Sequence, residues 1–225
     1  MMHLGHTPGA PKYDTQPLVV PVVSGFVPVD ERKKRGLFTP VYPGVREERV
    51  QVPMRTVVCY ECGRRSQIPE AALSAHCVHC RAHLSTADVE LKPGTRRLRV
   101  RTLGDVTLPA DVTLSHLNIV CRHLTLAGTA SGSLRCSGTL TLRGDARVDG
   151  QVQATSLVVP PGAAVAITPG ATVDDAEVGG RLVGSLHALH SVHIASGGEL
   201  VGDCQTPRLV VDPAGSHRGA FTRTS

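Results

Sequence analysis

The second half of the chain is organised around a short apolar pattern that returns at a nearly constant interval. From about residue 103, pairs of apolar residues separated by one residue recur every 16 to 18 residues, with one copy weakened. Because alternate residues of a strand face opposite sides, each pair predicts a short strand with one buried face. The pairs are Val106/Leu108, Leu124/Leu126, Leu140/Leu142, Leu157/Val159, Val192/Ile194 and Leu209/Val211, with a weaker copy near Ala176/Val178.

Glycines return in the same register and indicate a single repeated unit. Gly132, Gly150, Gly184, Gly202 and Gly219 are separated by 18, 34, 18 and 17 residues. A unit of this length is too short for a helical repeat or a propeller blade, and it matches one turn of a β-solenoid. We therefore predict an all-β fold, a parallel β-helix of about 6–7 short rungs over residues 103–222, with glycines at its corners.

One rung departs from this pattern. Residues 160–181 lack the glycine expected near Ile167 and contain three prolines. The sequence leaves the geometry of this rung open, whereas the repeats on both sides of it support the same fold.

Composition favours a narrow core and restricts the choice of partners. Aromatic residues make up 3% of the chain and Trp is absent, so the core must consist of Val, Leu, Ile and Ala. Residues 1–102 hold 16 Lys and Arg against 9 Asp and Glu, whereas residues 103–225 hold 8 against 10. A protein that bound nucleic acid along its whole length would not confine its positive charge to one half.

The first part of the chain differs from the repeats. Residues 1–54 are rich in Pro and Gly without helical or strand periodicity, which predicts a disordered tail. Within it, the apolar run Leu18 to Val29 precedes a charged cluster at residues 30–35. This combination allows weak contact with an anionic membrane surface, although the prolines exclude an amphipathic helix. Residues 93–102 are expected to connect the first part to the repeats.

Four cysteines lie between the tail and the repeats. Cys59, Cys62, Cys77 and Cys80 have the spacing C-x2-C-x14-C-x2-C, which is typical of a zinc ribbon. Each pair can form a turn that points two thiolates at one ion, and Gly63 suits such a turn. We predict a zinc-ribbon-like module over residues 55–92 with a closed structural Zn²⁺ site. A pair of redox disulfides is the alternative, and it needs an oxidising compartment.

The surroundings of the module leave its partner open. Arg64 and Arg65 lie in the first cysteine turn, and further arginines follow at residues 96–101. Tyr60 is the nearby aromatic residue, which leaves little surface for stacking on bases. We favour a module that recruits a protein partner or controls assembly, with nucleic-acid binding as the alternative.

The repeats resemble those of the bactofilin family. Residues 143–159 (RGDARVDGQVQATSLVV) and 197–221 (GGELVGDCQTPRLVVDPAGSHRGAF) read as a short apolar strand, an acidic or small residue, then Gly and a second apolar strand. The resemblance covers about residues 103–222. It implies a right-handed β-helix that assembles end to end into cytoskeletal filaments without a nucleotide.

The C-terminal end of the repeats carries no sequence that would cap it. The edge strands and apolar column at the end of a solenoid must be capped or paired. No amphipathic helix follows Val211, and Phe221 is the sole aromatic residue after Tyr60. Phe221 either stacks on the next subunit as a polymer contact or folds back over its own core, and the sequence leaves both roles open.

Catalysis is not expected. The sequence has no nucleophile elbow, P-loop or dinucleotide fingerprint, and its repeats lack the strict six-residue period of acyltransferase solenoids. His187, His190 and His193 alternate between strand faces and predict no shared metal site. Cys121, Cys136 and Cys204 are expected to be small buried residues. Without a signal-peptide pattern, the chain is expected in the cytoplasm, with contact to the inner membrane face left open.

Overall fold

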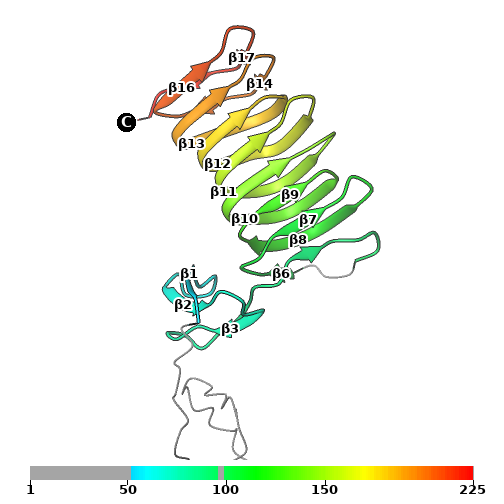
Figure 1. Ribbon diagram of the computed structural model, residues 1–225. Coiled ribbons are helices and arrows are strands. Elements are labelled where there is room, and N and C mark those ends of the chain that lie inside the picture. The colour runs from blue at the N-terminus through cyan, green and yellow to red at the C-terminus, as the bar shows by residue number, and fades with distance from the viewer. Residues whose placement is uncertain (1–51, 96–98, 225) are drawn as a thin grey trace, which may run out of the picture. The chain divides into compact units, whose positions relative to one another are not determined.

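The computed structural model describes residues 52–95 and 99–224, which form β-strands and turns without a helix (Figure 1). Strands β1 (Met54–Val58) and β2 (Arg65–Pro69) pair antiparallel, as do β3 (Ser74–His76) and β4 (His83–Ser85). The described residues offer no helical segment of the length and hydropathy needed to span a bilayer. The predicted tail lies outside the described residues except for residues 52–54, and so does its expected membrane contact.

The remaining strands form one 14-stranded sheet in which every pairing is parallel. They are β5 (Val89–Glu90), β6 (Arg99–Arg101), β7 (Val106–Leu108), β8 (Thr113–Cys121), β9 (Leu124–Leu126), β10 (Thr129–Leu142), β11 (Arg147–Val159), β12 (Ala164–Val178), β13 (Arg181–Ile194), β14 (Glu199–Val201), β15 (Cys204–Gln205), β16 (Arg208–Val211), β17 (Ser216–Arg218) and β18 (Phe221–Thr222).

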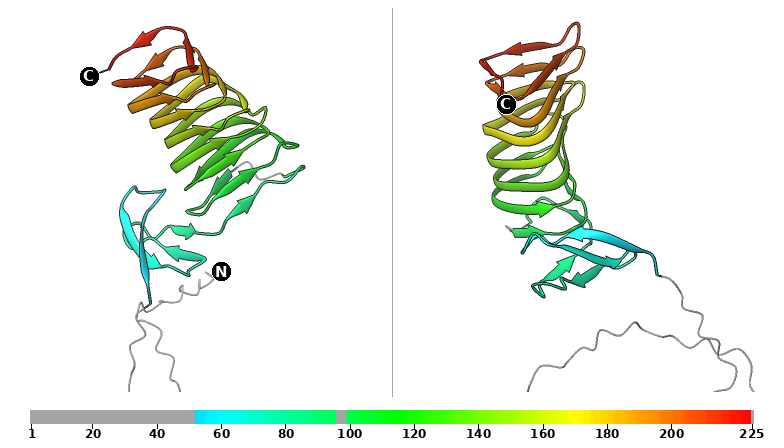
Figure 2. Two further views of the ribbon diagram at one scale, coloured as in Figure 1. Left: turned by 45° about the horizontal axis from the view of Figure 1, so that its top comes forward. Right: turned by 90° about the vertical axis from the view of Figure 1, so that its left-hand side faces the viewer.

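These strands wind into a β-solenoid of about 8 turns, each turn stacked on the previous one (Figures 1 and 2). The predicted all-β fold, a parallel β-helix, is confirmed. The repeated apolar pairs lie in register, and Ala176 stands between Leu157 and Val192 as the weaker copy should. The first members form one column through the wall: Val89, Val106, Leu124, Leu140, Leu157, Ala176, Val192 and Leu209.

Two further columns of inward side chains matter for the ends of the solenoid. The Leu91–Val211 column consists of the second members of the pairs, from Leu91 in the first turn to Val211 in the last. The Val100–Phe221 column lies on another strand of each turn. Its members are Val100, Ile119, Leu134, Val152, Ala171, Leu186, Cys204 and Phe221. Stacked aliphatic side chains therefore form a continuous core along the solenoid.

The periodic glycines form the expected corner. Gly132 and Gly150 are register partners with φ of +133° and +139°, a region that L side chains rarely adopt. A Cβ on Gly150 would come within 1.9 Å of the Gly132 carbonyl oxygen. The predicted glycine positions are therefore explained by both backbone conformation and the close approach of successive turns.

The rung at residues 160–181, which lacks the expected glycine, still pairs with the turn before it. β12 pairs with β11 from Ala166 to Val178, and Pro169 stands opposite Gly150. Its pairing with β13 shifts register between Ala166 and Gly170. The irregular residues 160–181 therefore change the corner locally and leave the stacking of the turns intact.

The solenoid includes residues that precede the expected start at 103. β5 pairs with β7, and β6 pairs with β8, so a further turn lies below the first predicted one. Val89 and Leu91 form another copy of the apolar pair, one interval before Val106/Leu108. This additional turn explains why the solenoid is longer than the repeats from residue 103 predict.

Candidate functional site

Two similar turns present the four cysteines. In the first, the Gly63 N–H donates to the Cys59 carbonyl (2.8 Å), and Gly63 has a φ of +70°. In the second, the Arg81 N–H donates to the Cys77 carbonyl (2.9 Å), and Arg81 has a φ of +59°. The residue after each Cys-x2-Cys pair therefore adopts the left-handed conformation that turns the chain back. Sequence reasoning found Gly63 by its residue type and missed Arg81, which has no such signal.

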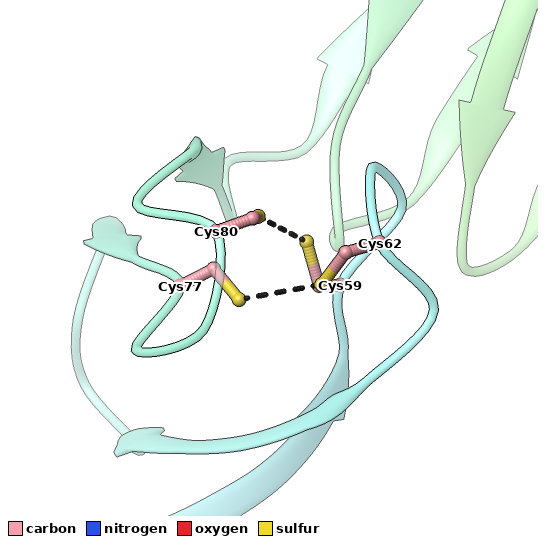
Figure 3. A group of neighbouring side chains, drawn as sticks. All are labelled: Cys59, Cys62, Cys77 and Cys80. Carbon is pink, nitrogen blue, oxygen red and sulfur yellow. Dashed lines mark hydrogen bonds between the residues drawn. The ribbon is translucent and has the colours of Figure 1, made fainter.

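The four thiols lie at the spacing of a tetrahedral metal site. The Sγ atoms of Cys59 and Cys80 are 3.7 Å apart, as are those of Cys62 and Cys77 (Figure 3). All four Sγ atoms lie within 4.8 Å of one another. Tetrahedral zinc with Zn–S bonds of about 2.3 Å would separate its sulfur ligands by about 3.8 Å. The predicted ligand set is brought together, and the cluster could hold one metal ion.

The local electrostatics favour a cation among these thiols. Hydrogen bonds from the Cys80 backbone N–H and the Ser66 hydroxyl lower the pKa of Cys77 to about 5. The Ala82 N–H also lowers the pKa of Cys80, but burial and three neighbouring thiols together raise it to about 12. One thiolate is thus stabilised while further negative charge in the cluster is disfavoured. A bound metal ion would remove this repulsion.

The four-cysteine module, residues 52–85, contacts the first turn of the solenoid. Arg101 on β6 forms an ion pair with Glu61, which lies between the first two cysteines. Leu103 packs against the small core of the module, which contains Cys59, Cys77 and Leu84. The cysteine cluster and the first turn are therefore linked by both charge and apolar contact.

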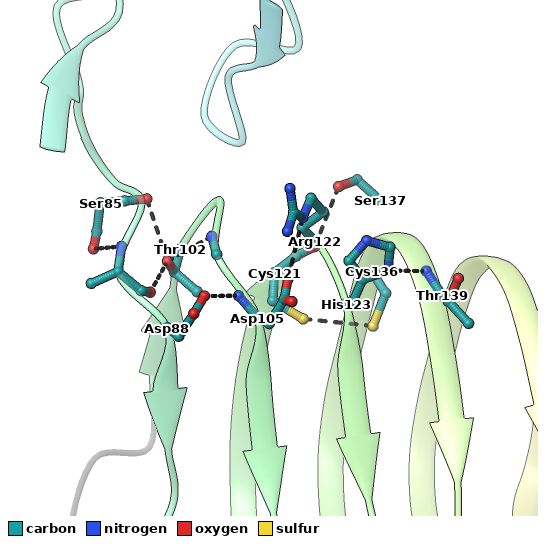
Figure 4. A network of polar contacts seen from close by, with 12 residues as sticks. Ser85, Asp88, Thr102, Asp105, Cys121, Arg122, His123, Cys136, Ser137 and Thr139 are labelled. Carbon is teal, nitrogen blue, oxygen red and sulfur yellow. Dashed lines mark hydrogen bonds and ion pairs between the residues drawn. The ribbon is translucent and has the colours of Figure 1, made fainter. Parts of the chain in front are cut away.

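The chain leaving the module adds a layer below the corner of the first turn (Figure 4). The Leu103 N–H donates to the Ser85 carbonyl (2.7 Å), and the Thr102 hydroxyl donates to the Ala87 carbonyl (2.6 Å). The Asp105 N–H donates to the Asp88 carboxylate (2.8 Å). Residues 85–88 therefore lie under residues 102–105 in the way that one turn lies under the next.

The last turn of the solenoid is covered less completely. In the part of the chain that the structure describes, β16, β17 and β18 pair only with the turn before them. Val210, Val211 and Phe221 expose 36%, 42% and 45% of their surface. Phe221 is the register partner of Cys204, which is fully buried. The side chain that ends the Val100–Phe221 column is therefore accessible.

His187, His190 and His193 do not alternate between the two strand faces as predicted, because each of them is at least partly exposed. His190 and His193 pair with different carboxylates, those of Asp175 (3.8 Å) and Asp212 (3.0 Å). Among the described residues, the four cysteines are the group of side chains that could share a metal ion. Cys121, Cys136 and Cys204 are buried in the core. Contact with Cys136 and burial raise the pKa of Cys121, so this thiol is protonated at neutral pH.

Comparison with known proteins finds similar proteins for part of this chain. Residues 88–168 match the family model described as bactofilin, polymer-forming cytoskeletal. The bactofilin BacP of Myxococcus xanthus (strain DK1622) is 36% identical over 90 residues, which cover 40% of this chain. The chain spans about a third of that relative's length (36%). No solved structure matches the chain.

The matched region agrees with the boundary seen in the structure. The family match begins at residue 88, next to β5, and therefore includes the first turn of the solenoid. The four-cysteine module precedes the matched residues. The family match therefore shows a similarity to bactofilins over residues 88–168 of the solenoid.

Proposed function

We propose that this protein is a polymer-forming cytoskeletal protein that associates with copies of itself through the C-terminal end of its solenoid. Support comes from the bactofilin match and from the exposure of Val210, Val211 and Phe221 on the last turn. The observation that carries the proposal is the accessible end of the Val100–Phe221 column. No nucleotide or catalytic step is needed for this association.

The physical reason lies in the parallel ladder. Within the described chain, each strand of the last turn pairs along one edge with the turn before it, so the backbone groups of its other edge can pair with another chain. Apolar side chains at the same end would lose contact with water in that pairing, which contributes roughly 25 cal/mol per Å². Both contributions favour a second copy of this chain as the partner, because the last turn of that copy presents the same strand edge and the same apolar residues.

Phe221 is assigned the role of an intermolecular contact. Cys204, the register partner of Phe221 in the turn before, fills the column below the ring. The exposed fraction of Phe221 is 45%. A ring in this position covers part of its own core and still offers a face to another chain. Stacking on a second copy would bury the remainder.

The nucleic-acid alternative receives less support. Arg101, part of the predicted basic cluster, is paired with Glu61 and is therefore partly neutralised. The described module residues offer Tyr60 for stacking, and its hydroxyl is engaged by the His83 carbonyl (2.7 Å). Recruitment of another protein by the module stays a prediction.

Negative-stain electron microscopy of the full-length protein without nucleotide tests the proposal. The wild type and a Phe221→Arg variant are compared in zinc-containing and in chelator-treated buffer. Leu189→Arg is the matched control, because Leu189 is a similarly exposed apolar residue (51%) on β13, away from the last turn.

In zinc-containing buffer we expect assembly by the wild type and the control and its loss in Phe221→Arg. Uniform single particles of the wild type in both buffers would contradict the proposed function. Assembly that persists in Phe221→Arg would support self-association but would show that Phe221 packs on the core of its own chain.

A further inference from the structure

The four-cysteine module has little core of its own. Its buried apolar side chains are those of Cys59, Ile68, Cys77 and Leu84, and two of these belong to the metal cluster. Domains this small rarely bury enough surface to fold alone, and bound metal then supplies the folding free energy. The folded state of the module should therefore depend on the occupancy of the cysteine cluster.

The module determines what lies under the first turn of the solenoid. At Gly104, a Cβ would come within 2.7 Å of the Thr86 and Ala87 carbonyl oxygens, so the two layers are in close contact there. Thr86 is itself held by the module, since its N–H donates to the Leu73 carbonyl (3.0 Å) and its hydroxyl to that of Ala72. The covering layer is thus fixed from both sides, by the solenoid and by the module.

The cysteine cluster is directly connected to this cover. Tyr60 follows Cys59, and its hydroxyl donates to the His83 carbonyl while accepting from the Ser85 N–H (3.4 Å). Glu61, two residues after Cys59, pairs with Arg101 in the first turn. Loss of the turn that holds Cys59 and Cys62 would therefore release contacts with both β4 and β6.

We propose that the four-cysteine module binds one Zn²⁺ and, in that state, acts as a removable cap on the N-terminal end of the solenoid. Zinc binding replaces the thiol protons, which pass to solvent, by four Zn–S bonds. The inference rests on the proposed function, because a cap is meaningful only if the solenoid associates through its ends.

The cap has a consequence for the size of the assembly. With the N-terminal end closed, chains meet through the last turn alone, and a two-fold contact of this kind closes after two chains. Unfolding of the metal-free module would release residues 85–88 from the corner at residues 102–105 and Glu61 from Arg101, and so provide a second contact surface. Zinc-bound protein should therefore form pairs, and zinc-free protein should form longer polymers.

The first measurement is zinc content and molar mass of the full-length protein in reducing buffer. Elemental analysis should find about one zinc per chain, and light scattering should give about twice the mass of one chain. Removal of zinc by a chelator should shift the protein to large polymers in light scattering and electron microscopy. Restored zinc should return the pairs.

Variants distinguish the loss of the cap from the loss of the metal. Cys80→Ser should lose zinc and form polymers without chelator, whereas the matched control Cys136→Ser, a cysteine buried in the solenoid core, should keep zinc and remain paired. Arg101→Glu should retain zinc and shift part of the protein to polymers, because it removes one of several contacts between the module and the first turn, and the exchange Glu61→Arg with Arg101→Glu should restore the pairs. Circular dichroism of the solenoid strands verifies that each variant is folded.

The outcomes distinguish the two proposals. Polymers of equal size with and without zinc would overturn the cap and leave the proposed function intact. A chain that binds no zinc would overturn the metal site. Single chains in every condition would overturn the proposed function itself, and the cap with it.

Discussion

The two ends of the solenoid continue the same columns of side chains but leave the final residues in different surroundings. Val100 and Phe221 end one column, and their exposed fractions are 5% and 45%. Leu91 and Val211 end another, with exposed fractions of 1% and 42%. In these two columns the same stacking therefore ends in a buried residue at the first turn and an accessible one at the last, whereas Val89 and Leu209, which end the column of first members, are both partly buried.

The difference lies in the chain beyond each end. Before the first turn, residues 85–88 leave the four-cysteine module and lie under the corner at Thr102. At the other end, Val211 and Phe221 pair with the turn before, at Ile194 and Cys204, and have no register partner beyond them among the described residues. Within the described chain, the two ends therefore differ in the contact that residues 85–88 make with the first turn.

Removal of the metal should produce the largest difference between the module and the solenoid. We expect chelation to abolish hydrogen-exchange protection in β1 to β4 while β10 to β13 stay protected, because the module depends on its metal and the solenoid does not. Hydrogen-exchange mass spectrometry of the full chain measures both regions at once. Unchanged protection in β1 to β4 after complete zinc removal would contradict a metal-dependent module.

An interior residue and an end residue of one column should differ strongly in their contribution to folding. Leu134 is fully buried, so Leu134→Ala should lower the free energy of unfolding by about 2–5 kcal/mol. Phe221→Ala should lower it much less in a dilute, unassembled sample, because the ring is partly exposed. Urea unfolding of both variants gives the comparison. Equal losses would mean that Phe221 belongs to the core of its own chain.

The first turn should behave like the interior. Val100→Ala removes buried methyl groups and should lower the free energy of unfolding by roughly 1.5–3 kcal/mol, without affecting association through the last turn. Denaturation and light scattering of the same sample test the two parts of this expectation. A loss of association in Val100→Ala would place a contact at the end that we describe as covered.

The ion pair between the module and the first turn should have the smallest effect on stability. Arg101 and Glu61 have side-chain exposures of 28% and 40%, so Arg101→Glu should cost about 0.2–1 kcal/mol. The loss should be smaller in high salt, because salt screens the pair in the wild type. Thermal unfolding at two salt concentrations measures it, and a loss independent of salt would exclude an electrostatic cause.

Much of this architecture follows from the sequence because it depends on local spacing. The interval of the apolar pairs, the glycine corner and the Cys-x2-Cys turns each fix a conformation within a few residues. The module predicted over residues 55–92 includes Val89 and Leu91, although this pair stands one interval before Val106/Leu108. The pairing of β5 with β7 places the pair in the solenoid.

The contacts between module and solenoid could not be predicted in this way. Glu61 and Arg101 are 40 residues apart in the chain, and no periodicity relates them. The packing of Leu103 against the module core likewise depends on how two structures meet. The difference between the two ends is therefore a tertiary property, although each repeat is visible in the sequence.

The central claim, that the accessible last turn is the surface of self-association, is tested most directly by analytical ultracentrifugation of the zinc-bound, full-length protein. Wild type and Leu189→Arg should sediment as pairs of chains, and Phe221→Arg should sediment as single chains. An unchanged sedimentation of Phe221→Arg, with the protein folded and zinc bound, would contradict the account and move the contact away from the last turn.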